Sequence, residues 1–214
     1  MSVGVPTIAT LGAFALASLA LLVIPGPAVL YVLNRSVSDG RRIGLAAVAG
    51  LQLGSMVHVL AAAVGLSAVI AASALAFNAV KWLGVVYLVW IGVRTMRLPA
   101  VAMRADLTRT SQRRAFTQGV VVNALNVKIA LFFLSFLPQF LDPDRGWVGV
   151  QALLLGLVFV SIALCTDSLY ALAASGLREV LLRGRSLAFV QRWVAGSIYI
   201  GLGVVAATTH PSRT

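Results

Sequence analysis

Long apolar stretches alternate with short basic segments along this chain. No Asp, Glu, Lys or Arg occurs between Met1 and Asn34 or between Ile43 and Val80. Apolar stretches of more than about 18 residues with few charges are candidate membrane-spanning helices. The pattern therefore predicts an all-α membrane protein in which the whole chain, 1–214, forms a single polytopic membrane domain. Its six transmembrane helices are expected at about 6–34, 43–71, 76–97, 115–141, 147–177 and 188–209.

The composition supports this class. Of the 214 residues, 60% are hydrophobic and 11% are charged, whereas about a quarter of the residues in a soluble domain are charged. The first apolar stretch lacks a basic segment before it and continues into Pro25-Gly26-Pro27, so we do not expect a cleavable signal peptide. The single cysteine, Cys165, excludes an intramolecular disulfide, and its apolar surroundings predict a packed thiol.

The positive charge is concentrated between particular spans. Thirteen of the 17 Lys and Arg residues fall in or beside the first, third and fifth connections. A net charge of +11 can indicate a nucleic-acid partner, but basic residues restricted to short loops fit the positive-inside rule instead. We therefore expect no nucleic acid as a partner. The rule places loops 35–42, 98–114 and 178–187 in the cytoplasm and both termini outside.

The two halves of the chain share a short pattern near their ends. At an offset of 112 residues, Gly84 and Tyr87 match Gly196 and Tyr199, each pair preceded by a basic residue and a Trp. Three spans per repeat is an odd number, so the second copy would be inverted in the membrane. Inverted repeats are a recurrent architecture of secondary transporters. The predicted division is repeat one at about 1–97, a cytoplasmic linker at 98–114 and repeat two at 115–214.

The first predicted span is broken by Pro25-Gly26-Pro27. Proline removes a backbone donor and clashes with the preceding turn, so the helix must unwind there. In lipid, freed backbone groups persist only where they face protein or a water-filled cavity. The half-helix that follows would present amides and a partial positive charge to a carboxylate. The alternative is a purely structural proline kink.

The fourth predicted span carries a second polar interruption. Asn123, Asn126 and Lys128 occur there among apolar residues, and Asn123 and Asn126, three apart, share a helix face. Paired interruptions in corresponding spans of two halves indicate a transport site. The two asparagines could instead bond neighbouring helices. The predicted substrate-binding residues are Pro25, Gly26, Pro27, Asn123, Asn126 and Lys128.

Three segments of the chain, in order, resemble the lysine exporter (LysE/RhtB) family of bacterial amino-acid efflux proteins. They read "IPGPAVLYVLNRSVSDGRRIGLAAVAGLQLGSMVH", "NAVKWLGVVYLVWIGVRTMR" and "FTQGVVVNALNVKIALFFLSFLPQFL". The resemblance implies six spans in a bacterial inner membrane, with export of amino acids or similar small solutes coupled to an ion gradient. The family usually has Asn-Pro-Lys early in the fourth span, whereas this chain has Val127 in place of the proline.

Two ionisable residues fall deep within predicted spans, Lys128 and Asp167. Each is costly at the centre of a bilayer and is a functional candidate for that reason. Asp167 resembles in position an acidic residue of the family and is predicted to carry the coupling proton, since a change in its surroundings could load and release one. Lys128 could assist coupling or attract a substrate carboxylate. The alternatives are a fixed ion pair between the two and, for Lys128, snorkelling to an interface.

The second predicted span supplies weaker candidates. His58 is a candidate proton relay or a hydrogen-bonded structural histidine. Gln52 is a second-tier polar candidate, and its six-residue separation from His58 places the two about 240° apart on a straight helix. Gly50 and Gly54 have the spacing that lets helices pack closely.

These features predict a secondary active exporter and not an enzyme. The alternatives are a metal-ion exporter of a related superfamily or an intramembrane enzyme, but the sequence contains neither a metal-ligand cluster nor a nucleophile with a base in reach. No cofactor and no metal site are expected. The expected partners are an amino acid or small amphoteric solute, a proton, the lipid bilayer and, as an option, a second copy in a homodimer.

Overall fold

The computed structural model of the chain describes residues 5–72, 82, 86, 93 and 110–176. This part of the chain is helical and contains no strand. Its α-helices are α1 (Ile8–Val23), α2 (Pro27–Asp39), α3 (Arg41–Ala72), α5 (Gln112–Ala124), α6 (Val127–Ser135) and α7 (Val148–Gly176). Two short 3-10 helices, η1 (Leu137–Phe140) and η2 (Pro143–Arg145), connect α6 to α7. The predicted third and sixth spans lie almost wholly outside the described residues.

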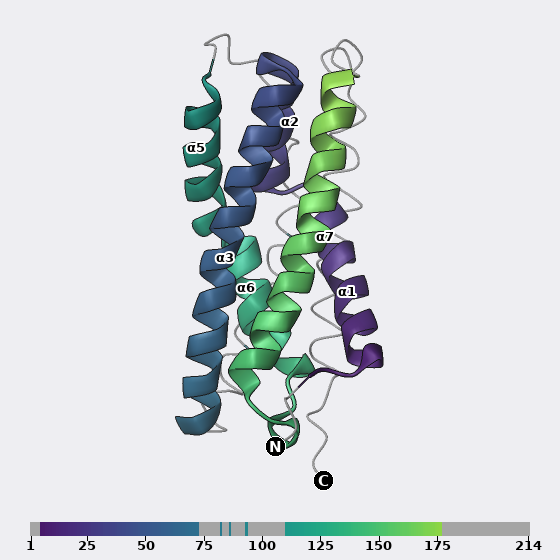
Figure 1. The fold of residues 1–214 in the computed structure, drawn as a ribbon, viewed down its shortest axis with the longest axis vertical. Coiled ribbons are helices and arrows are strands. Elements are labelled where there is room, and N and C mark those ends of the chain that lie inside the picture. The colour runs from purple at the N-terminus through teal and green to yellow at the C-terminus, as the bar shows by residue number, and fades with distance from the viewer. Residues whose placement is uncertain (1–4, 73–81, 83–85, 87–92, 94–109, 177–214) are drawn as a thin grey trace.

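The helices lie lengthwise beside one another, as Figure 1 shows. Two of them, α3 and α7, are long and apolar enough to cross a membrane. Two further segments are bent helix pairs that are long and apolar enough only when each pair is taken together: α2 is inclined by 55° to α1, and the α6–η1 segment by 43° to α5. Both interruptions predicted from the sequence, in the first and fourth spans, are therefore present as breaks between helices.

The two bent pairs run in opposite directions. The chain passes from α1 at one end of the molecule to α2 at the other, whereas α5 and α6 follow in the reverse sense (Figure 1). The junction of α2 with α3, the start of α5 and the end of α7 all lie at one end. In the described residues that end carries most of the arginines, while Arg145 near the opposite end has Asp142 and Asp144 beside it.

The helix boundaries follow from local chemistry. The hydroxyl of Thr7 accepts from the amide of Thr10 and caps α1, and Ser111 caps α5 in the same way. Gly40 separates α2 from α3 with a φ of +89°, a conformation that side chains with a Cβ rarely adopt. The chain therefore turns from one helix into the next within a single residue.

The first connection begins later than the sequence predicts. Residues 35–42 were expected to be a loop, but α2 continues to Asp39 and α3 begins at Arg41. Arg35 is only 8% exposed because its guanidinium pairs with Asp39 at 3.1 Å and also donates to the Thr110 hydroxyl. Because its charge is paired with Asp39, Arg35 lies inside α2 and does not mark the start of a loop.

Helix α3 occupies the centre of the described structure and contacts α2, α5 and α7. Its glycines allow the backbone of α5 to approach closely, since a Cβ built at Gly54 would lie 2.6 Å from the carbonyl oxygen of Val120. From the other side, a Cβ at Gly119 would lie 2.6 Å from the carbonyl oxygen of Ala47. The predicted packing role of Gly50 and Gly54 is confirmed by this contact.

The largest cluster of buried apolar residues draws on α1, α3, α6 and α7. Five phenylalanine side chains are buried there, and the rings of Phe132 and Phe159 lie 5.4 Å apart between centroids. The cluster comprises Phe14, Phe132, Phe133, Phe136 and Phe159. Cys165, by contrast, is exposed on α7, so the prediction of a packed thiol is wrong. A helix that is apolar all round gives no sequence signal for which side faces the core.

Candidate functional site

The two helix breaks meet at one place. The ammonium of Lys128, at the start of α6, donates to the carbonyl oxygen of Ile24 at 2.8 Å, directly before the break between α1 and α2. Gly26 is close enough that a Cβ built there would lie 3.2 Å from Cδ of Lys128. The predicted convergence of the two interruptions is thus seen in the structure, across 104 residues of sequence.

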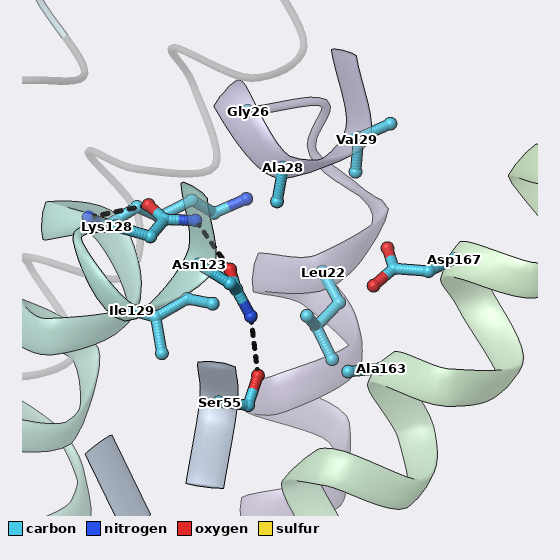
Figure 2. A pocket seen from close by; sticks show the side chains of 11 residues that line it. Leu22, Gly26, Ala28, Val29, Ser55, Asn123, Lys128, Ile129, Ala163 and Asp167 are labelled. Carbon is cyan, nitrogen blue, oxygen red and sulfur yellow. Dashed lines mark hydrogen bonds between the residues drawn. The ribbon is translucent and has the colours of Figure 1, made fainter. Parts of the chain in front are cut away.

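A small cavity lies between the breaks. Figure 2 shows Asn123 and Lys128 on one side of it and Asp167 reaching in from α7 on the other. About 20 Å³ of the cavity is open to the centre of a water molecule, which is room for one or two waters and too little for an amino acid. Its lining residues are Leu22, Gly26, Ala28, Val29, Ser55, Asn123, Asn126, Lys128, Ile129, Ala163 and Asp167.

The half-helix α2 begins with an open end at this cavity. Its N-cap is Gly26, which has no side chain to accept from the first-turn amides, and Pro27 at the first helical position has no amide hydrogen. The amides of Ala28 and Val29 belong to the first turn, where an α-helix supplies no partner for its N–H groups. Both residues line the cavity, so this end of α2 can take an anion.

The half-helix α6 begins differently, because the side chain of its N-cap residue bonds an amide of the first turn. Asn126 is the N-cap, and its side-chain oxygen accepts from the amide of Lys128 at 3.1 Å. The first helical residue is Val127, a position whose amide needs no partner within the helix. The break therefore forms without the proline that the family usually has at this position. Asn126 is already extended, with φ −77° and ψ 99°, as a residue before proline would be.

Asn123 connects the second break to α3. Its side-chain amide donates to the hydroxyl of Ser55 and to the carbonyl of Leu51, both at 2.7 Å, and its side-chain oxygen accepts from Asn126. Its backbone carbonyl lies 2.9 Å from Nε2 of His58. Because a carbonyl only accepts, this Nε2 carries a hydrogen. Asn123 therefore bonds a neighbouring helix, one of the two interpretations of this residue, and it also lines the cavity.

Asp167 is 4% exposed and projects into the cavity from the middle of α7. Its carboxylate accepts from Nε2 of Gln52 at 2.9 Å. The other end of that amide, Oε1, has no hydrogen-bond partner among the described residues. The side chains of Asp167 and Lys128 both line this cavity, so the two groups face a common space.

The structure thus brings most of the predicted residues together. Gly26, Asn123, Asn126, Lys128 and Asp167 line the cavity, and Gln52 contacts Asp167. Pro25 and Pro27 form the break but are not part of the lining, and His58 bonds the end of α5 instead of facing the cavity.

Two residues at the site were not singled out from the sequence. Ser55 lines the cavity and accepts from Asn123. Tyr170 donates its hydroxyl hydrogen to the carbonyl of Val23 at 2.7 Å, at the first break. Tyr170 follows Asp167 by three residues, so a search along the helical face of Asp167 would have found it.

Comparison with known proteins identifies relatives over almost the whole chain. The family model described as "LysE type translocator" matches residues 19–210. A Vibrio cholerae protein described as an uncharacterized membrane protein is 34% identical, over 92% of this chain and 95% of its own. The homoserine/homoserine lactone efflux protein of Salmonella typhimurium is 28% identical, over 92% and 96% of the two chains. The leucine efflux protein of Klebsiella pneumoniae is 27% identical, over 88% and 90%. No solved structure matches the chain significantly.

Proposed function

Because this chain belongs to the LysE family of translocators, we propose that it is a proton-coupled secondary exporter of neutral amino acids or closely related small metabolites. Two of its relatives are named for the efflux of homoserine or its lactone and of leucine, and homoserine and leucine are zwitterions with uncharged side chains. The observation that carries the proposal is the cavity at which two broken helices meet, with one buried cation and one buried anion facing it.

The charges around the cavity suit a zwitterion. The carboxylate of an amino acid would bind the first-turn amides of Ala28 and Val29 at the uncapped end of α2, with Lys128 beside them. Its ammonium group would bind Asp167 on the opposite wall. A solute with this pattern leaves neither buried charge without an opposite partner. The apolar lining, which includes Leu22 and Ile129, would contact the side chain.

Asp167 is placed to carry the proton. In its ionised form the carboxylate accepts from Gln52, as in this structure. In its protonated form the acid would have to donate, and rotation of the Gln52 amide would bring the unpartnered Oε1 to accept that hydrogen. The pair can therefore satisfy both protonation states with one side-chain rotation, and Gln52 is a functional partner of Asp167 in this proposal.

Transport would proceed by alternating access around the cavity. The space in the cavity is too small for an amino acid, so loading would require the bent pairs to move. The opposite directions of the two pairs support the proposed inverted repeats. The clustering of arginines at one end supports a cytoplasmic position for that end, with both termini outside the inner membrane.

The test is efflux from cells loaded with a panel of labelled amino acids. Cells that express the chain should release neutral amino acids faster than cells with an empty vector, and a protonophore should abolish the uphill component. Thr166→Val is a matched control, because among the described residues Thr166 bonds only carbonyls of its own helix and does not line the cavity. Release of metal ions without release of any amino acid would refute the proposal.

A further inference from the structure

The first helix break leaves the carbonyl of Val23 without its helical partner. In a continuous α-helix each carbonyl accepts from the amide four residues later. For Val23 that residue is Pro27, which has no amide hydrogen. The hydroxyl of Tyr170 on α7 donates to this carbonyl at 2.7 Å, in the place of the missing amide.

The carbonyl of Ile24 has also lost its helical partner. Its helical partner would be the amide of Ala28, but that amide now belongs to the first turn of α2 on the other side of the break. The ammonium of Lys128 on α6 donates to the Ile24 carbonyl at 2.8 Å. Two adjacent carbonyls freed by the Pro-Gly-Pro break are thus bonded by side chains from two other helices.

We propose that Tyr170 and Lys128 together hold the first break in its bent form, and that a substrate carboxylate releases it by drawing Lys128 away from Ile24. The two bonds differ in what can break them. Lys128 lines the cavity and can exchange a carbonyl for a carboxylate, which is a stronger partner for an ammonium group. Tyr170 does not line the cavity, so its bond to Val23 persists when the solute enters.

Tyr170 is accordingly a positioning residue for the α1–α2 hinge. It lies one turn beyond Asp167 on α7, and its ring packs against the cluster formed by Val29, Leu33, Val37 and Ala174. That packing alone would be a structural role, so the test must remove the hydroxyl and keep the ring. The role of the substrate rests on the proposed function, whereas the bonds that hold the break do not.

The experiment is a double-mutant cycle of Tyr170→Phe and Pro27→Ala, read by amide hydrogen exchange in purified full-length protein. Tyr170→Phe should raise exchange in a peptide covering residues 20–30 by about two- to tenfold, the effect of one hydrogen bond. Pro27→Ala restores an amide that can donate to Val23. In that background Tyr170→Phe should change exchange by less than about twofold, because the carbonyl keeps a partner.

Two further measurements fix the interpretation. A peptide covering residues 120–130, at the second break, should be unaffected, and Thr166→Val on α7 should leave residues 20–30 unchanged. Equal effects of Tyr170→Phe in both backgrounds would show that the hydroxyl acts other than through the Val23 carbonyl and would overturn the proposal. No effect in either background would overturn it as well.

Transport kinetics separate this inference from the proposed function. For a transported amino acid, Tyr170→Phe should lower the maximal rate severalfold and leave the half-saturating concentration within about twofold, since the hydroxyl positions the hinge without contacting the solute. An increased half-saturating concentration with an unchanged maximal rate would contradict the positioning role. If the chain exports no amino acid, the proposed function fails, while the hydrogen-exchange cycle still decides whether Tyr170 holds the break.

Discussion

Asp167→Asn is the substitution that tests the coupling mechanism most directly. The amide has nearly the shape of the carboxylate, so no cavity is created beside the neighbours of Asp167. It retains an oxygen that can accept from Gln52, as the carboxylate does at 2.9 Å. The variant therefore removes the titration and leaves the packing of α7 in place.

The expected cost in stability is small. A hydrogen bond to a charged group contributes about 1.5–3 kcal/mol and a neutral one about 0.5–1.5 kcal/mol, so the difference is about 1 kcal/mol. Removal of a buried charge works in the opposite direction. The net change in unfolding free energy should stay within about 1 kcal/mol. A fixed ion pair between Asp167 and Lys128 would instead cost about 3–5 kcal/mol when one partner is removed.

The assay combines unfolding in detergent with transport in vesicles. Asp167→Asn should unfold nearly as the wild type does and should lose uphill export driven by a pH gradient. Exchange of labelled for unlabelled solute, which moves no net proton, should persist at raised solute concentrations, because the neutral amide binds the ammonium group of the solute more weakly than the carboxylate does. A loss of about 3 kcal/mol or more that Lys128→Met restores, together with uphill export, would show that the two residues form a structural pair and that Asp167 is not the proton carrier.

Three further substitutions test the fold around the site. Gly54→Ala should destabilise the protein by about 1–3 kcal/mol, because the added methyl group would contact the backbone of α5. Gly65→Ala should not destabilise it, because a Cβ there meets nothing within 4 Å. Unfolding curves measure both effects. Arg35→Gln should lower the free energy of unfolding by about 3–5 kcal/mol, because it leaves the buried carboxylate of Asp39 without its cation. Arg145→Gln, at an exposed pair, should lower it by less than about 1 kcal/mol in the same measurement. Val127→Pro should change stability by less than about 1 kcal/mol, because the first helical position needs no amide hydrogen; a cost above about 3 kcal/mol would show that residue 127 is effectively interior to a helix.

The breaks could be predicted from the sequence because they depend on local chemistry. Proline lacks a donor wherever it stands, so Pro25 and Pro27 identify the first break without knowledge of its neighbours. Asparagine is a preferred N-cap residue, so Asn126 and the polar residues around it identify the second break. Asp167 and Lys128 could be selected because a buried charge in an apolar span is rare.

The partners of these residues could not be predicted in the same way. Gln52 and Asp167 are separated by 115 residues, and their contact depends on the rotation of α3 and α7 about their axes. Helix α7 is apolar on all sides, so its sequence does not reveal which face Asp167 shares with the core. The burial of Arg35 was missed although its partner Asp39 lies four residues later, a spacing that predicts an ion pair on a helix.

The phenylalanine cluster has a consequence for proton leakage. Phe132, Phe133 and Phe136 follow Lys128 along the chain toward the end of α6, and Phe159 lies about two turns before Asp167 on α7, so the cluster stands between the cavity and the end of the molecule that carries Arg145. Protons move through proteins along chains of water and polar groups, and phenylalanine rings offer neither donors nor acceptors. If Asp167 carries the proton as proposed, the clustered rings would obstruct such a path between Asp167 and that end within the described part of the chain. A carrier driven by a proton gradient needs such insulation, because a continuous hydrogen-bonded path would dissipate the gradient without moving any solute.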